Sequence, residues 1–301
     1  MTSPILAQDS PYGRLYRHPL TPSNTLPTIE ESIEKGLLVP SVTNIIGTLD
    51  KPFLLGWYAK LAAESAVETE QKHSGLIRAK PDAAIKHFKN AGLRKLEAAG
   101  ILGNAVHNAV EQLAQGIEVE YPEYIEGYIN SFHKFIKDWQ PEFIHFEVTC
   151  FGSVLDSTLG ELKYAGTADF IAKINGLTVI GDWKSGKSIH TEGSLQIAAL
   201  ANAKEMITSE GEVIQMPKAD SGVLVHLTPK GFHVYQTDPF GTAWDTFGVL
   251  RRAWDFHVAN LASRNPILMS RPLKSPEKLV VPTVTNASSL KSGIMGIPEK
   301  E

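Results

Sequence analysis

The stretch Tyr164-Ala-Gly-Thr-Ala-Asp-Phe-Ile-Ala-Lys-Ile-Asn-Gly-Leu-Thr-Val-Ile-Gly-Asp-Trp-Lys184 decides the fold expected for this 301-residue chain. At its centre, Asn175-Gly176 separates two runs rich in β-branched and apolar residues, which is the strongest short signal for a β-hairpin. A two-residue turn at this point pairs Ile174 with Leu177 and fixes the register of both strands. The sequence therefore predicts antiparallel strands over 163–174 and 177–184.

This register places two carboxylates opposite each other. Asp169 and Asp182 become cross-strand neighbours, with Cβ atoms about 5 Å apart. Two like charges in that position destabilise a sheet unless something offsets them, and a divalent cation would do so. The hairpin therefore predicts a metal site between the two aspartates.

Alternation along a strand assigns the other side chains of the hairpin to its two faces. Lys184 shares the face of Asp182, whereas Trp183 points to the opposite face with Phe170 and Ala168. Two carboxylates and an ammonium group are thus expected to converge on one side, with an aromatic ring anchoring the strand from the other.

The residues of this pattern, Gly166-Thr-x-Asp169 and then Asp182-x-Lys184, resemble the PD-(D/E)XK nuclease superfamily, in particular its RecB-like exonuclease branch. The resemblance implies an α/β (α+β) fold with a restriction-endonuclease-like αβββαβ core, in which helices flank a mixed central sheet, and an N-terminal helical extension. It implies that Asp169 and Asp182 bind Mg²⁺ or Mn²⁺ and that Lys184 orients or helps deprotonate the attacking water. Phosphodiester hydrolysis explains these residue types, because oxygen-liganded cations neutralise phosphoryl charge and lysine is a compact positive charge.

Three further positions follow from the same resemblance. Gly103-Asn-Ala-Val-His107 resembles the Gly-x-x-x-His element of the branch, with Asn where Thr is frequent, and implies His107 as a third ligand that would favour Mn²⁺. Glu147 matches a glutamate that supports the metal or its water, and the main-chain carbonyl of Trp183 is a further ligand in the family. From the residues alone, a helical histidine is more often a surface or packing residue, and Glu147 is equally an edge-strand charge.

A helix expected over 194–208 carries the last catalytic candidate. Gln196 resembles the glutamine that contacts DNA or the catalytic centre in RecB-like enzymes. The partner tyrosine four residues later is Leu200 here, so that role is not carried over. We also expect Thr167 to face Lys184 in the hairpin register.

A second motif overlaps the first, since the segment 181–188 fits the P-loop pattern G-x-x-x-x-G-K-[ST]. A phosphate cradle works through closely approaching backbone N–H groups, and Asp182 and Trp183 would put a negative charge and a bulky ring inside it. A P-loop helix would also start at once, whereas the sequence predicts a connecting turn before a helix near Ser194. A P-loop ATPase therefore stays the less favoured alternative.

Composition sets wider limits. The chain is 43% hydrophobic, with a net charge of −4 and a pI of about 6.2, which counts against a uniformly basic nucleic-acid binder but permits a local basic groove. A single cysteine, Cys150, excludes an internal disulfide and a self-contained iron–sulfur cluster. With neither a signal peptide nor a spanning segment expected, the predicted location is the cytoplasm of a bacterium or a phage-infected host. Candidate groove residues are Arg78, Lys80, the basic run 86–95, and Arg251-Arg252.

The pattern divides the chain into four parts. We expect an irregular N-terminal arm over 1–38, a helical region carrying the histidine element over 39–142, the nuclease core over 143–265, and a disordered tail over 270–301. Ser41 is the expected N-cap of the first helix. Further expected helices cover 82–99, 104–115, 122–139 and 242–262, and further expected strands cover 143–152, 221–228 and 232–237.

The function expected from these observations is that of a metal-dependent DNA nuclease, more specifically an exonuclease in phage or bacterial DNA replication, recombination or repair. Its expected partner is single- or double-stranded DNA, with a helicase or recombinase as a candidate protein partner and no membrane. The alternative from another class is a catalytically silent DNA-end-binding recombination accessory protein.

Overall fold

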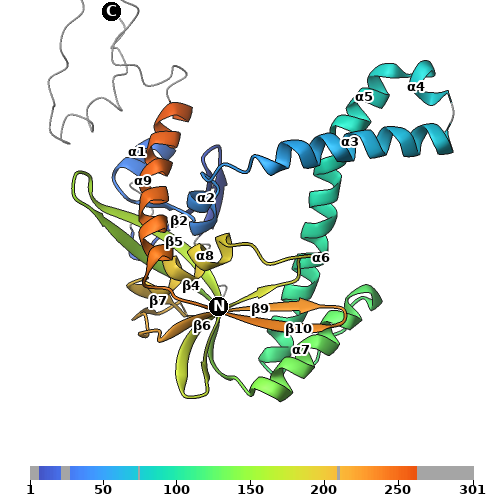
Figure 1. Ribbon diagram of the computed structural model, residues 1–301. Helices are drawn as coiled ribbons and strands as arrows, with labels where there is room; N and C mark the ends of the chain where they lie inside the picture. The colour runs from blue at the N-terminus through green and yellow to red at the C-terminus, as the bar shows by residue number, and fades with distance from the viewer. Residues whose placement is uncertain (1–6, 22–27, 74, 209–210, 263–301) are drawn as a thin grey trace, which may run out of the picture.

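A mixed seven-stranded sheet organises the molecule, for which the computed structural model describes residues 7–21, 28–73, 75–208 and 211–262 (Figure 1). The strand order is β10-β9-β6-β5-β4-β7-β8, in which β6 and β9 are parallel and all other neighbours are antiparallel. The strands are β4 (Glu142–Asp156), β5 (Gly160–Ile174), β6 (Leu177–Lys184), β7 (Glu205–Ile207), β8 (Val213–Gln215), β9 (Ser221–Thr228) and β10 (Gly231–Thr237).

Helices cover both faces of this sheet and extend beyond it. They are α1 (Ile29–Glu34), α2 (Val42–Ile46), α3 (Phe53–Lys72), α4 (Leu76–Ala79), α5 (Pro81–Lys89), α6 (Ala91–Ala114), the 3₁₀ helix η2 (Glu123–Ile125), α7 (Glu126–Trp139), α8 (Glu192–Ala201) and α9 (Thr242–Ala262). The described helices include none that is long and apolar enough to cross a membrane. The expected N-cap at Ser41 is confirmed, because its hydroxyl accepts a hydrogen bond from the Asn44 N–H at 3.0 Å.

The predicted hairpin register is confirmed from Ile174↔Leu177 to Phe170↔Gly181. The two turn residues have positive φ angles, 50° at Asn175 and 77° at Gly176, as a type I′ turn requires. Gly181 has no alternative, because a Cβ there would lie 1.9 Å from the Phe170 ring. Local turn chemistry and one close packing contact therefore hold the hairpin in the register that creates the site.

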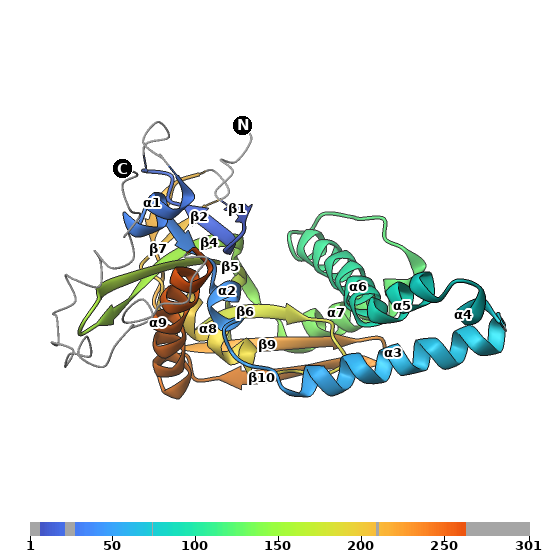
Figure 2. The same cartoon turned by 90° about the horizontal axis from the view of Figure 1, so that it is seen from above.

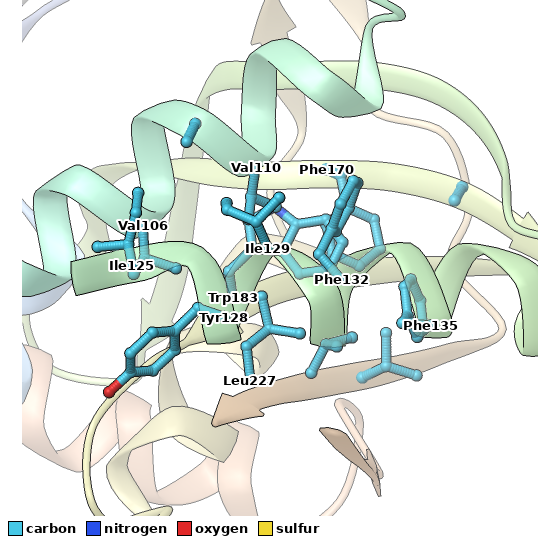
Figure 3. Close-up of a cluster of buried hydrophobic side chains, with 14 of the residues drawn as sticks. Val106, Val110, Ile125, Tyr128, Ile129, Phe132, Phe135, Phe170, Trp183 and Leu227 are labelled. Carbon is cyan, nitrogen blue, oxygen red and sulfur yellow. The ribbon is translucent and has the colours of Figure 1, made fainter. Parts of the chain in front are cut away.

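An aromatic cluster fills the sheet face covered by α6 and α7 (Figure 3). Trp183 lies at its centre, 2% exposed, with ring centroids 4.4 to 6.3 Å from those of Phe170, Phe132, Phe135 and Phe143. This burial anchors the strand that carries Asp182 and Lys184, as the sequence predicted.

The opposite face packs against α8, and here strict alternation fails. Phe170 belongs to the aromatic cluster, but Ala168 packs in the other cluster with Ile171 and Ile180, so the prediction that Ala168 shares the face of Phe170 is wrong. The break falls at Glu147, whose φ of 45° interrupts β4 opposite this point of β5. A left-handed residue inside a strand rotates the chain, so Phe146 and Val148 on either side of Glu147 pack on opposite faces. Their partners on β5, Phe170 and Ala168, follow them.

Three expected element boundaries also need correction. The described residues 7–21 and 28–40 are not irregular, since β1 (Ala7–Ser10), β2 (Gly13–Arg17) and β3 (Leu38–Pro40) form a small antiparallel sheet. The helix expected over 194–208 ends at Ala201, and β7 follows because it pairs with the edge of β4. The helices expected over 82–99 and 104–115 divide at Asn90, and α6 continues through Gly100 and Gly103. The tail expected over 270–301 lies outside the described residues.

A helical arm projects from the sheet in both views (Figures 1 and 2). It consists of α3, α4, α5 and the first half of α6, and α3 contains no buried residue. Gly92 lets α6 approach α3, because a Cβ there would lie 2.1 Å from the Tyr58 ring. From this contact α6 returns to the sheet and brings His107 to the end of β6.

Candidate metal centre

Three side chains from three separate elements converge at the point where β5 and β6 diverge. His107 of α6, Glu147 of β4 and Asp169 of β5 each offer a ligand atom, and these atoms all lie within 4.8 Å of one another. We call these three residues the metal cluster. Their chemistry, one imidazole and two carboxylates, suits a divalent cation such as Mn²⁺ or Mg²⁺.

His107 also approaches the main-chain ligand that the resemblance implies. Its Nε2 lies 3.2 Å from Asp169 Oδ2 and 3.0 Å from the carbonyl oxygen of Trp183. Both neighbours are acceptors, so this nitrogen carries a proton in the metal-free arrangement. A cation bound at Nε2 would require the other tautomer, with the proton on Nδ1.

Asp169 is held in place by the strand that carries the second aspartate. Its Oδ2 accepts a hydrogen bond from the Trp183 N–H at 2.7 Å. Asp169 lies one residue beyond Phe170, the last paired residue of β5 in the hairpin. Burial, followed by the negative charge of Asp182, raises the pKa of Asp169 well above its usual range. The two aspartates are therefore close and mutually repulsive, as the sequence predicted.

Asp182 belongs to a second group, completed by Lys184 and Gln196, which we call the lysine group. Gln196 of α8 donates to Asp182 Oδ1 at 2.8 Å and accepts from Lys184 Nζ at 3.1 Å. Lys184 Nζ lies 2.5 Å from Asp182 Oδ2, but their alignment is not that of a hydrogen bond. One amide side chain thus positions both the carboxylate and the ammonium group.

This geometry fits a cation, because Asp182 Oδ2 is buried and has no hydrogen-bond partner among the described residues. Such an oxygen costs free energy unless a charge compensates it, and an ammonium group alone leaves its lone pairs misaligned. A divalent cation between Asp169 and Asp182 would satisfy this oxygen and offset the repulsion between the two carboxylates.

Glu147 combines an unusual backbone with an unusual carboxyl group. Non-glycine residues with positive φ cost about 1–3 kcal/mol and cluster at functional sites, and its φ of 45° is such a case. Its side chain is exposed, yet the loss of part of its hydration, followed by the charges of Glu111 and Asp182, raises its pKa to about 7.

Some of the predicted site residues lie in the metal cluster or the lysine group, and others lie away from both. His107, Glu147, Asp169, Asp182, Lys184, Gln196 and the Trp183 carbonyl all lie in or beside the two groups. Thr167 does not hydrogen-bond to Lys184; its hydroxyl lies 3.3 Å from that of Tyr16. Leu200 is a core residue, 1% exposed.

The sequence pattern assigned no role to Glu111. Glu111 lies four positions after His107 and therefore on the same helix face, and its charge contributes to the raised pKa of Glu147. The i, i+4 spacing was the signal that could have identified it as part of the site's electrostatics.

The P-loop pattern at 181–188 does not adopt P-loop geometry. Its first residues form the end of β6, and α8 begins only at Glu192. Asp182 and Trp183 are both buried in the strand, so they leave no cradle of backbone N–H groups at this point.

Comparisons with known proteins add no family. No protein-family model matches the chain, and no curated protein matches it. Among solved structures, the crystal structure of SSO0001 is similar over 75% of this chain and 85% of that chain, with 15% identical residues and a TM-score of 0.33.

Proposed function

We propose that this protein is a divalent-metal-dependent deoxyribonuclease that hydrolyses phosphodiester bonds as an exonuclease. The observation that carries the proposal is the convergence of the metal cluster and the lysine group at the end of β6. Like charges placed together in this way destabilise the fold. A bound cation would offset the repulsion between the carboxylates, and the same cation would neutralise charge on a phosphoryl substrate.

The order of elements supports a restriction-endonuclease-like αβββαβ core. Helix α7 precedes β4, β5 and β6, and α8 then crosses to β9, which pairs in parallel with β6. The short strands β7 and β8 are additions between α8 and β9 at the far edge of the sheet. In this core the candidate site lies at the end of β6.

The metal would be held by His107, Asp169, Asp182 and the Trp183 carbonyl, with Glu147 supporting it or its water. A bound Mg²⁺ or Mn²⁺ supplies positive charge to the scissile phosphate and lowers the pKa of an attacking water.

Lys184 keeps an ammonium group where it can orient that water or a phosphate oxygen. Gln196 acts through others as a positioning residue, since it fixes Lys184 and Asp182 together.

The choice of an exonuclease rests on the likeness of the Gly103–His107 element to RecB-like enzymes. The proposed setting is phage or bacterial DNA replication, recombination or repair, in the cytoplasm. There the protein would act at ends of single- or double-stranded DNA, beside a helicase or a recombinase.

Two alternatives make different predictions. A silent DNA-end-binding accessory protein would bind DNA without cutting it, but it has no use for two buried carboxylates whose charges repel. A P-loop ATPase would lose ATP hydrolysis on Lys187→Ala and tolerate Asp169→Ala, and the strand conformation of 181–184 counts against it.

The test is digestion of end-labelled single- and double-stranded DNA with Mg²⁺, Mn²⁺ or EDTA. We expect metal-dependent cleavage that Asp182→Asn and Lys184→Ala each reduce by at least about 100-fold, the scale of one lost electrostatic contact to the reacting group. Asp138→Asn and Lys173→Ala are matched controls on exposed positions and should cleave like wild type.

The label pattern decides polarity and separates exonuclease from endonuclease. Cleavage without metal, or cleavage retained in both site variants, would contradict the proposed mechanism. A folded wild type that binds DNA and cuts it under no metal condition would favour the accessory protein.

A further inference from the structure

A pocket of about 680 Å³ opens beside the lysine group. It is lined by the loop between β6 and α8, by the start of α8, and by one face of β9 and β10. The metal cluster and the lysine group include none of its lining residues, so the pocket is separate from the proposed catalytic site.

Strand pairing connects the pocket to the proposed catalytic site. Lys184 of β6 pairs with His226 of β9, and His226 pairs with His233 of β10. Paired residues point to the same face of a sheet, so these three side chains form a row from the lysine group into the pocket. A ligand that extends along this row from Lys184 would enter the pocket directly.

The charge of the lining favours an anion. Of the twelve described residues that line the pocket, none is acidic, although the chain as a whole carries a net charge of −4. Lys187 supplies a positive charge, and Ser188 and Thr191 supply hydroxyl groups from the same loop. The nearest carboxylate on α8, that of Glu192, is paired with Lys51 at 2.9 Å. These groups suit a phosphate, which lysine binds as a point charge.

The strand side of the pocket presents rings. His226 is buried, and its Nε2 is fixed by a hydrogen bond to the Gly186 carbonyl oxygen at 2.7 Å. His233 and Tyr235 are exposed, with ring centroids 6.5 Å apart, and His233 lies 6.3 Å from His226. Exposed rings beside the loop that carries Lys187 suit the sugar and base of a nucleotide, because bases stack on aromatic and imidazole faces.

We propose that this pocket holds the nucleotide next to the scissile phosphate in the same DNA strand. Its phosphate contacts Lys187 and the hydroxyl groups of Ser188 and Thr191, and its base stacks on His233 and Tyr235. The position beside the scissile bond rests on the proposed nuclease function. The nucleotide-binding pocket itself is tested separately.

The first experiment measures binding of thymidine 5′-monophosphate and of inorganic phosphate to the metal-free protein by calorimetry. We expect Lys187→Ala to weaken binding of the nucleotide about tenfold, as for one lost charge-assisted hydrogen bond. His233→Ala with Tyr235→Ala should weaken it at least about fivefold by removing the stacking surface, with little effect on inorganic phosphate. Lys230→Ala, in the exposed turn between β9 and β10, is the matched control.

The second experiment measures cleavage of single-stranded DNA by the same variants, each checked by circular dichroism. Lys187→Ala should raise KM about tenfold with little change in kcat. It should also make the slope of log binding constant against log salt concentration shallower, by about the amount that one phosphate contact contributes. The histidine–tyrosine double variant should raise KM as well.

The outcomes separate the two proposals. Nucleotide binding unchanged in the pocket variants, or equal affinity for nucleotide and inorganic phosphate, would overturn the pocket. Pocket binding without any DNA cleavage by wild type would overturn the nuclease and the adjacency to a scissile bond. A kcat loss with unchanged KM would also contradict a binding pocket.

Discussion

The sheet and the helical arm bury their side chains to opposite extents. Trp183 in the sheet is 2% exposed, whereas α3 in the arm has no buried residue and its Leu55 is 78% exposed. Helix α6 belongs to both regions: Leu93 in the arm is 55% exposed, and Val106 beside the sheet is completely buried. Apolar burial is therefore concentrated around the sheet, and the contacts there contribute most of the free energy of unfolding.

The sheet also contains two buried carboxylates close to each other. The buried core holds Asp169 and Asp182 side by side, and burial, followed by the charge of Asp182, raises the pKa of Asp169. The arm instead exposes basic side chains that have no such conflict. The two carboxylates therefore lower the stability of the fold at the proposed active site. The aromatic cluster on the other face of the sheet offsets this loss by burying apolar surface.

Replacing the central aromatic residue of the sheet should produce the largest difference in stability between the sheet and the arm. Trp183→Ala removes a buried ring that contacts four others, so we expect a loss of about 3–5 kcal/mol in the free energy of unfolding. Leu55→Ala in the arm should change it by less than about 0.5 kcal/mol. Urea denaturation of both variants measures this, and similar losses would refute the claim that burial is concentrated in the sheet.

The exposed lysines of the arm should affect DNA binding without affecting stability. If the arm contacts the substrate, the triple variant Lys86→Ala, Lys89→Ala and Lys95→Ala should weaken DNA binding at least about tenfold at low salt. Fluorescence anisotropy across a salt series should also give a shallower slope for the variant. The double variant Lys134→Ala, Lys137→Ala on exposed positions of α7 is the control. An equal loss of binding in the control would show that net charge alone, and not contact with the arm, causes the effect.

Removing one site carboxylate should stabilise the metal-free protein. The pKa of Asp169 is higher in the folded state than its ordinary value of 3.8, so its contribution to stability is fully present below about pH 4 and is lost as the pH rises through the folded-state value. Asp169→Asn removes this loss, and we expect it to raise the stability at pH 7 in EDTA by at least about 1 kcal/mol.

Thermal unfolding between pH 4 and 8 measures this effect, with Asp138→Asn as an exposed control. Mn²⁺ should stabilise wild type more than Asp169→Asn, since the variant lacks a ligand. A lower melting temperature for Asp169→Asn at pH 7 in EDTA would show that the carboxylate stabilises the fold and is not in conflict with its neighbour.

Local sequence signals predicted much of the fold and of the candidate site. Asn175-Gly176 fixed the hairpin register, and the alternation after it placed Asp182 and Lys184 on the face away from Trp183. Ser41 capped its helix as expected. These features depend on neighbours a few residues away, so the sequence contains their causes directly.

Other features depended on contacts between distant segments. The sequence did not reveal that β7 pairs with the edge of β4 and so ends α8 at Ala201, or that Gly92 lets α6 pass close to α3. It also missed the reversal at Glu147, because a positive φ inside a strand leaves no clear sequence pattern. Packing and strand pairing across the chain decided each of these points.

The sequence by itself determined which side chains could do chemistry here: two opposed aspartates, a lysine two residues on, and a histidine on a preceding helix. Only the tertiary structure decided that α6 and α8 approach the end of β6, where His107 meets Asp169 and Gln196 joins Asp182 to Lys184. The physical reason is that turn and strand propensities act over a few residues, whereas the meeting of helices with strands depends on burial of side chains far apart in the chain.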